Sequence, residues 1–285
     1  MPPTSCSTDR VTPSGRARSG RIGAALRAAG AARRRGFIPF LTAGFPDRDA
    51  FLRAGEHLAA GGADVLEIGI PFSDPIADGP TIQRASERAL AGGVTPEGVL
   101  EMTSALRARC AIPIVLMTYV NPVLAFGVER FARSAREAGA DGVLVSDLPP
   151  EEGSAAYATL RAEGLDTILL VAPTSAPERL AVIARECRGF LYVLARTGVT
   201  GAGAGISTRL DELLQRARAA TALPLAVGFG VRTGADVAAL PRAADAAIVG
   251  AALLERLEED PRGLAPFAAL VDEIRGALPF GERRA

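Results

Sequence analysis

Residues 59–69 read AAGGADVLEIG: small residues, an acid, and then a short aliphatic run typical of a β-strand. This unit recurs along the chain, and further apolar runs bring the number of predicted strands to eight. The eight segments are FIPFLT (37–42), AAGGADVLEIG (59–69), IPIVLMTY (112–119), EAGADGVLVSD (137–147), AEGLDTILLVA (162–172), CRGFLYVLA (187–195), PLAVGFG (224–230) and AADAAIVG (243–250). Stretches with helical spacing separate them, for example residues 130–139 and 209–220. Alternating strands and helices predict a parallel sheet, because parallel neighbours need a crossover connection.

Eight such units in about 250 residues favour a closed (β/α)8 TIM barrel. An open, doubly wound sheet is the alternative, but no G-x-G-x-x-G motif follows the first predicted strand. We therefore expect one barrel domain over residues 21–280, opening with a short helix at 22–29. Residues 1–20 are rich in Ser, Thr, Pro, Gly and Arg and lack an apolar period, which predicts a disordered basic tail. An organellar transit peptide has a similar composition, but no amphipathic period is present to favour it.

The composition narrows the classes of function. Of the 285 residues, 48% are hydrophobic and 22% charged, and 32 basic residues balance 32 acidic ones. A chain of this length can bury a substantial core. It contains no run of roughly 18 apolar residues that would span a membrane. Zero net charge argues against nucleic acid as the main partner, so we expect neither a membrane nor a nucleic-acid partner.

All 32 basic residues are arginines, and the chain contains no lysine. This excludes a Schiff base between a substrate and a protein amine, and it excludes a Walker phosphate loop. The only histidine is His57, and Cys6, Cys110 and Cys187 lie far apart, so we expect no metal site. Scattered cysteines give no disulfide framework, which is typical of a reducing compartment and predicts a cytoplasmic location.

A charged residue interrupts the second predicted strand. In DVLEIG, side-chain alternation places Glu67 on one face and Leu66 and Ile68 on the other. Because the aliphatic pair suits the side that packs on helices, we expect Glu67 to point into the barrel mouth, where such barrels carry their active sites. Partial burial raises the pKa of a carboxyl group and suits it to acid–base catalysis near neutral pH. Considered alone, Glu67 fits equally well as the partner of an arginine at the barrel rim.

The loop after this strand carries two more acids. Residues 71–83, PFSDPIADGPTIQ, contain Asp74 and Asp78 in a segment stiffened by three prolines. Acids in such a loop can orient a substrate or bind a metal, although Asp and Pro also favour ordinary turns. Asp78 precedes Gly-Pro-Thr, a pattern that starts helices.

Glycines follow the last three predicted strands. They lie in residues 196–205 (RTGVTGAGAG), 228–230 (GFG) and 250–251 (GA), the last just before a predicted helix. Loops after the seventh and eighth strands of such barrels frequently bind phosphate through backbone amides. Glycine allows the backbone to approach a ligand closely. Together the three segments predict a phosphorylated substrate.

Longer strings resemble one family closely. PFLTAGFPD (39–47) and LEIGIPFSDPIADGPTIQRA (66–85) are similar to the signature of tryptophan synthase alpha subunits, the indole-3-glycerol-phosphate lyases. The similarity continues in register through YVNPVLAFGVERF, DGVLVSDLPPEE, VAPTSAPERL, LARTGVTGA and VGFGVRT, from about residue 22 to 275. It implies retro-aldol cleavage of indole-3-glycerol phosphate to indole and D-glyceraldehyde 3-phosphate in L-tryptophan biosynthesis. The family uses the indolenine tautomer of the substrate as electron sink, which agrees with the absence of lysine.

The resemblance also implies roles for individual residues. Glu67 matches the catalytic glutamate that moves protons between indole C3 and the glycerol hydroxyl, and Asp78 matches the acid that accepts the indole N–H. Thr200 matches a loop threonine that contacts Asp78 when the loop closes. Positions around the indole ring fall on Phe40, Met117, Tyr119, Leu144, Leu170, Tyr192 and Phe229, and those that hold the phosphate fall on Gly201, Gly230, Gly250 and Ala251. Met117, Tyr119 and Tyr192 also suit an ordinary core.

Two positions depart from the family pattern. Ala251 stands where several members have a serine, so the phosphate keeps a backbone amide and loses a hydroxyl donor. Ala195 stands where a serine usually precedes the glycine-rich loop, and no physical reason explains this change.

The resemblance implies a partner as well. Family members assemble with a pyridoxal-phosphate-dependent beta subunit as an α2β2 heterotetramer, with Asp74 on the loop that faces the partner. No cofactor is expected on this chain. Two alternatives stay open: a stand-alone lyase that releases free indole, and a non-catalytic, phosphate-binding barrel, which would require the loss of Glu67 or Asp78.

Overall fold

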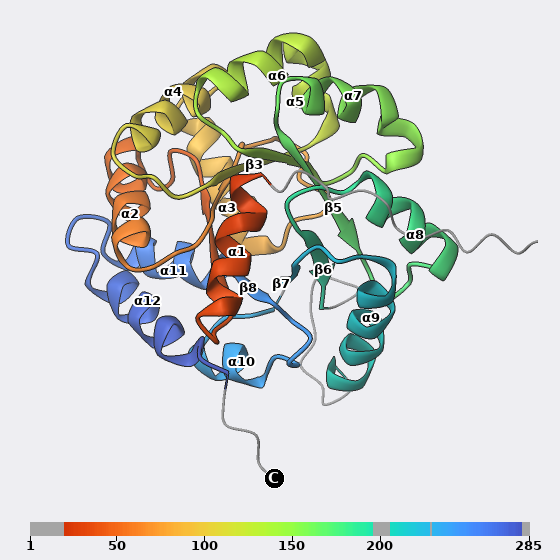
Figure 1. The fold of residues 1–285 in the computed structure, drawn as a ribbon. Coiled ribbons are helices and arrows are strands. Elements are labelled where there is room, and N and C mark those ends of the chain that lie inside the picture. Colours follow the sequence, from red (N-terminus) through yellow and green to blue (C-terminus); the bar gives the residue numbers. More distant parts are fainter. Residues whose placement is uncertain (1–19, 196–205, 229, 281–285) are drawn as a thin grey trace, which may run out of the picture.

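Parallel strands close into a barrel in the computed structural model, which describes residues 20–195, 206–228 and 230–280 (Figure 1). The strands are β1 (Gly36–Thr42), β2 (Leu66–Gly69), β3 (Ile114–Thr118), β4 (Gly142–Val145), β5 (Asp166–Val171), β6 (Leu191–Leu194), β7 (Leu225–Gly228) and β8 (Ala246–Val249). Each strand pairs with the next, and β8 pairs with β1, so the barrel has no open edge. The predicted TIM barrel is confirmed. Every strand lies within its predicted segment except β1, which begins one residue earlier, at Gly36.

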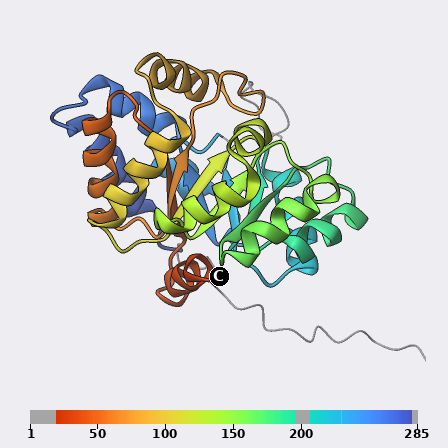
Figure 2. The same ribbon diagram turned by 90° about the horizontal axis from the view of Figure 1, so that it is seen from above.

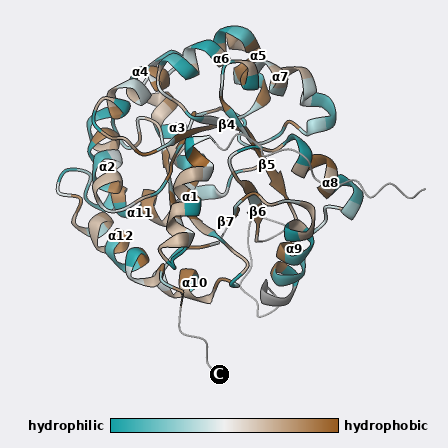
Figure 3. Ribbon diagram, in the orientation of Figure 1, coloured by the Kyte–Doolittle hydropathy of each residue, from teal (hydrophilic) through white to brown (hydrophobic). Residues whose placement is uncertain are grey.

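Helices surround the barrel (Figure 1). They are α1 (Arg21–Ala31), α2 (Arg48–Ala60), α3 (Pro80–Ala91), α4 (Pro96–Arg107), α5 (Val120–Phe126), α6 (Val128–Glu137), α7 (Pro150–Ala162), α8 (Pro177–Glu186), α9 (Ile206–Ala220), α10 (Gly234–Ala239), α11 (Ala251–Glu259) and α12 (Ala265–Ala277). Local sequence starts several of them. Asp47 caps α2 by accepting the Ala50 N–H at 2.8 Å, and α3 begins at the proline two residues after Asp78, as the Asp-Gly-Pro pattern predicted. Figure 3 shows hydrophobic strands inside a ring of helices with hydrophilic outer faces.

The acids that precede several strands tie neighbouring strands together at the amino-terminal end of the barrel. Asp64, before β2, accepts the Phe37 N–H of β1 at 2.8 Å. Asp141, before β4, accepts the Ile114 N–H of β3 at 2.9 Å. Asp245, before β8, accepts the N–H of Leu225, the first residue of β7, at 2.7 Å. Each of these acids also pairs with an arginine. The repeated acid is therefore a structural feature, which satisfies backbone donors that would otherwise lack a partner.

Helix α1 closes the amino-terminal end of the barrel, across which it lies in Figures 1 and 2. Ile22 is fully buried, and its Cδ1 lies 2.8 Å from the point where a Cβ on Gly142 would stand, at the start of β4. Arg21 pairs with Asp141 at 2.7 Å. The helix predicted at 22–29 is thus confirmed and extends to Ala31. Of the predicted tail, residues 1–20, all but Gly20 lie outside the described residues, and Gly20 is the N-cap of α1.

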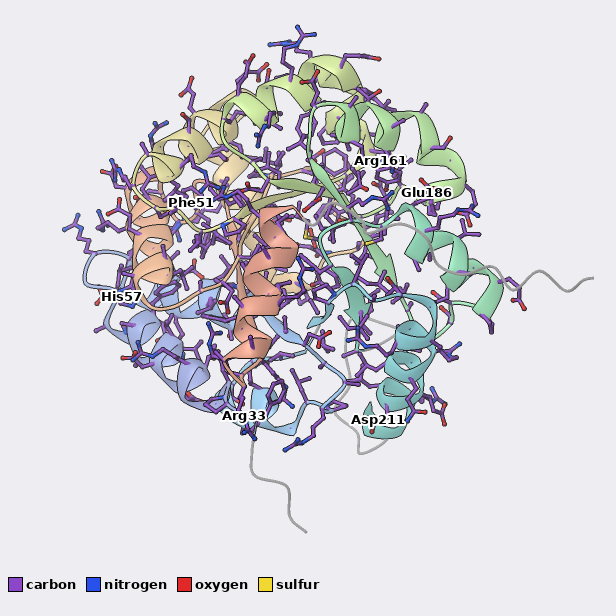
Figure 4. All side chains as sticks on the ribbon, in the orientation of Figure 1. Arg33, Phe51, His57, Arg161, Glu186 and Asp211 are labelled. Carbon is purple, nitrogen blue, oxygen red and sulfur yellow. The ribbon has the colours of Figure 1, made fainter. Side chains whose placement is uncertain are left out.

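Side chains fill the space between strands and helices (Figure 4). Between α7 and α8, Arg161 and Glu186 form an ion pair of 3.2 Å, and both are labelled in Figure 4. Within the described ranges, no helix combines the length and the apolar character needed to cross a membrane. With α1 over one end, the cavity described next lies at the opposite end, where the strands have their carboxyl termini.

Candidate active site

A cavity of about 280 Å³ lies at the carboxyl ends of the strands. Its wall combines apolar and aromatic side chains, two acids and glycine-rich turns. Its described lining residues are Phe40, Glu67, Asp78, Gly79, Pro80, Thr81, Ile82, Met117, Tyr192, Gly230, Val231, Arg232, Ile248, Gly250 and Ala251. This is the usual position of the active site in a (β/α)8 barrel.

Glu67 points into the cavity from β2, as side-chain alternation predicted. Its neighbour in register is Phe40 of β1, which also lines the cavity. The side chain is 1% exposed, and neither carboxyl oxygen has a hydrogen-bond partner among the described residues. Burial and the nearby charge of Asp78 raise the pKa of Glu67 to about 8. Since Glu67 pairs with no described arginine, the structure does not support the alternative of a rim ion pair.

Asp78 lies beside Glu67 at the end of the loop between β2 and α3. A turn bond from the Asp78 N–H to the Pro75 carbonyl, 3.0 Å long, shapes the loop. The side chain is 5% exposed, and its Oδ1 has no partner among the described residues. Burial raises the pKa of Asp78 to about 6, and a hydrogen bond from the Tyr119 hydroxyl works in the opposite direction. The same hydroxyl accepts the Ala77 N–H at 3.1 Å, so Tyr119 fixes this end of the loop.

Two inward-facing glycines make room for the aromatic walls. A Cβ on Gly69 would stand 2.5 Å from Cζ of Phe40, and a Cβ on Gly228 would stand 2.3 Å from the hydroxyl oxygen of Tyr192. Both distances are far too short for any side chain larger than hydrogen. Phe40 and Tyr192 are each almost fully buried, at 4% exposure. The glycines therefore allow two aromatic rings to reach across their neighbouring strands and form a flat apolar pocket beside the acids.

The glycine-rich turns of the cavity offer backbone donors. Gly230 has φ +94°, a conformation that favours glycine, in the turn after β7. Gly250 is the N-cap of α11 and provides no side-chain cap, so the first N–H groups of that helix are left for a ligand. A helix N-terminus with free N–H groups favours an anion. The geometry therefore suits a phosphate group at these turns.

Other residues singled out from the sequence lie elsewhere. Leu144 and Leu170 are in register with Met117 and Tyr192, so their side chains point to the barrel interior, and Leu170 lines a neighbouring cavity. Asp74 is exposed on the loop and accepts the Ser73 hydroxyl at 2.6 Å. Thr200, Gly201 and Phe229 lie outside the described residues. Among those that are described, no cluster of three or more His, Cys, Asp or Glu could hold a metal.

Several lining residues were not singled out from the sequence. They are Gly79, Pro80, Thr81, Ile82, Val231, Arg232 and Ile248. Ile248 could have been found, because alternation in the last strand places it on the same face as Gly250. Arg232 has no comparable signal, since an arginine in a turn is usually a solvated surface residue.

Comparison with known proteins agrees with this geometry. Residues 26–275 match the family described as tryptophan synthase alpha chain. The chain is 48% identical over 254 residues to the tryptophan synthase alpha chain of Roseiflexus sp. (strain RS-1), covering 88% of this chain and 96% of that one. It is 47% identical to that of Dechloromonas aromatica (strain RCB), over 85% and 91% of the two chains.

Solved structures give the same result. A chain of Mycobacterium tuberculosis tryptophan synthase superposes with a TM-score of 0.85 at 40% identity, covering 92% of this chain and all of that one. The tryptophan synthase alpha chain of Legionella pneumophila subsp. pneumophila superposes with a TM-score of 0.81 at 38% identity, over 90% and 97% of the two chains. By sequence and by structure, the chain belongs to the tryptophan synthase alpha chain family.

Proposed function

We propose that this chain is a lyase of tryptophan biosynthesis that cleaves indole-3-glycerol phosphate to indole and D-glyceraldehyde 3-phosphate. One observation carries the proposal. Two buried carboxyl groups, Glu67 and Asp78, face one end of a cavity and keep oxygens without a hydrogen-bond partner among the described residues. Buried polar groups normally have partners, so an unpaired pair of acids is typical of a site whose partner is the substrate.

The two pKa values divide the roles of the acids. With a pKa of about 8, Glu67 is mostly protonated at neutral pH and can act as an acid. With a pKa of about 6, Asp78 is mostly ionised at the same pH and can accept a proton. Environments that separate the pKa values of two neighbouring groups are a common way to assign acid and base in one site.

The proposed reaction proceeds in two stages. Glu67 first gives its proton to indole C3, while the indole N–H proton moves towards the Asp78 carboxylate, which yields the indolenine tautomer. The Glu67 carboxylate then takes the proton of the glycerol hydroxyl next to the ring. The C–C bond to the ring breaks, its electron pair restores the ring double bond, and the ring nitrogen recovers its proton from Asp78. Both acids return to their starting states, and the products are indole and the aldehyde.

The cavity walls fit the two halves of this substrate. Phe40, Met117 and Tyr192 form the apolar side, where a flat indole ring can lie against the acids. Gly230 and the amino-terminal end of α11 at Ala251 line the same cavity, and free backbone N–H groups there suit the phosphate. A substrate bound through its indole ring and its phosphate group has its reacting carbon held beside the acids. Holding the reacting groups in position in this way raises the reaction rate.

A beta subunit is the proposed partner, in an α2β2 assembly in which that subunit carries pyridoxal phosphate and this chain carries no cofactor. Among the described residues, Ile76 and Leu124 are the large hydrophobic side chains that stay exposed, at 78% and 59%. Ile76 and Asp74 belong to the loop that carries Asp78, and Leu124 belongs to α5, whose N-cap is Tyr119. Exposed apolar residues beside a catalytic loop favour a protein interface there. We place the reaction in the cytoplasm.

Indole release from indole-3-glycerol phosphate tests the proposal, measured with the purified chain alone and with its beta subunit. We expect slow cleavage by the chain alone and faster cleavage when the partner orders the catalytic loop. Equal rates with and without the partner would favour a stand-alone lyase. If no cleavage occurs under either condition, the remaining alternative is a non-catalytic, phosphate-binding barrel. The presence of both buried acids argues against that alternative.

A further inference from the structure

Among the described residues that line the catalytic cavity, one is cationic, Arg232. The same cavity contains two acids, Glu67 and Asp78. In the proposed reaction, a substrate with a doubly charged phosphate must enter this space. Backbone N–H groups carry only partial charges, so a full positive charge near the phosphate end would offset much of the repulsion between the phosphate and the ionised acid.

Arg232 is held in position by its neighbours. Its backbone N–H is bound by the Asp236 carboxylate at 2.9 Å, within the capping box that starts α10. Its guanidinium pairs with Glu255 of α11, and the other carboxyl oxygen of Glu255 accepts the Thr81 hydroxyl of α3 at 2.9 Å. The arginine is therefore fixed relative to the helix that begins at Ala251 and to the helix that follows the catalytic loop.

The ion pair lies where the catalytic cavity and a second cavity share Arg232 as a lining residue. Arg232 lines both cavities, whereas Glu255 lines only the second. Arg232 follows Gly230 by two positions in the chain, and both line the catalytic cavity together with Ala251. A guanidinium has five N–H donors, so it can bind a phosphate oxygen while it stays paired with a carboxylate.

We propose that Arg232 is a substrate-binding residue that selects for the phosphate group of the substrate. It supplies the side-chain donor that Ala251, with no hydroxyl, does not supply. This inference rests on the proposed function, because it takes indole-3-glycerol phosphate as the substrate. Its alternative is an ion pair with Glu255 that only joins two surface elements. Since Arg232 is about half exposed, such a pair would contribute little to stability or to catalysis.

Steady-state kinetics of Arg232→Gln, Arg232→Lys and wild type test the proposal, with indole-3-glycerol phosphate and its phosphate-free analogue indole-3-glycerol as substrates. We expect Arg232→Gln to raise KM for the phosphorylated substrate on the order of 10-fold, which is the size of one charge-assisted contact, and to leave kcat nearly unchanged. Arg232→Lys keeps the charge and should recover part of the loss. The KM for indole-3-glycerol should not change in any variant.

Arg256→Gln is the matched control. Arg256 also lies on the rim of the second cavity and pairs with Glu259, but it does not line the catalytic cavity. The same loss of charge there should leave KM unchanged. Raising the salt concentration from roughly 0.05 to 0.5 M should increase KM more for wild type than for Arg232→Gln, because salt screens a partly exposed charge.

The outcomes separate this inference from the proposed function. An active wild type whose KM is the same in Arg232→Gln overturns the inference alone. The inference is also wrong if the KM rises equally for the phosphate-free analogue, or equally in Arg256→Gln. A wild type that forms no indole overturns the proposed function, and the inference falls with it. Thermal melting of each variant shows whether a changed KM reflects misfolding. If Arg232→Gln does not fold, the KM of a folded Arg232→Lys is compared with that of wild type instead.

Discussion

Replacing Glu67 with Gln should make the folded protein more stable at alkaline pH. The carboxyl group is buried without a hydrogen-bond partner among the described residues, and its pKa rises from 4.5 to about 8. Between pH 4.5 and 8, the unfolded chain has lost this proton and the folded chain still holds it. The stability that the protonated form provides is therefore fully present below pH 4.5 and is lost as pH rises through 8. Glutamine does not titrate, so Glu67→Gln does not lose this stability as pH rises.

The size of the effect follows from the shift. The interval from pH 5 to the pKa of Glu67 in the folded protein, about 8, is about 3 units. A shift of one pKa unit corresponds to about 1.36 kcal/mol of free energy. The free energy of unfolding of wild type should thus fall by about 4 kcal/mol relative to that of Glu67→Gln between pH 5 and pH 9. Urea unfolding of both proteins at the two pH values measures this difference.

A matched control uses Glu101→Gln, because Glu101 is 69% exposed and pairs only loosely with Arg48, at 3.7 Å. This variant should follow the pH dependence of wild type. If Glu67→Gln also follows wild type within about 1 kcal/mol, Glu67 does not hold a proton in the folded state at neutral pH, and the assignment of Glu67 as the acid is refuted.

Three other expectations concern the surroundings of the acids. Tyr119→Phe removes the hydrogen bond that lowers the pKa of Asp78. The acidic limb of the pH profile of kcat should therefore move above about 6. An unchanged acidic limb would show that Asp78 does not need to be ionised for catalysis. Leu124→Glu should weaken activation by the beta subunit and leave the rate of the chain alone unchanged, and undiminished activation would place the partner on another surface. Deletion of residues 1–19 should change neither the melting temperature nor indole formation, and a large loss of either would assign these residues a role in folding or catalysis.

Much of the fold could be predicted because it depends on local patterns. Each strand is a short aliphatic run between helical segments, and alternation within DVLEIG was enough to aim Glu67 at the barrel interior. The repeated acids before the strands can be recognised in the sequence, but their structural role cannot be predicted from it. Asp64 and Asp141 bind the backbone of the preceding strand, a contact that depends on how strands lie side by side in the closed barrel.

The site was less predictable from residue patterns alone. Asp78 lies in a loop, where no periodicity indicates direction, and only the resemblance to a family distinguished it from Asp74. The loop is held in place by Tyr119, which lies 41 residues after Asp78 in the chain and whose hydroxyl accepts the Ala77 N–H. Arg232 was missed because its place at the cavity depends on Glu255 and Thr81, which come from two other helices. Contacts of this kind follow from the tertiary structure.

The most direct test of the central claim, that Glu67 is the acid–base group of a lyase, is the turnover of indole-3-glycerol phosphate by Glu67→Gln. The glutamine keeps the size of the side chain and leaves the apolar pocket and the phosphate end intact, so substrate affinity should stay close to that of wild type. The rate of indole formation should fall by roughly 10²–10⁴-fold, the usual effect of losing a positioned acid–base group. Near-normal turnover by a folded Glu67→Gln would contradict the account.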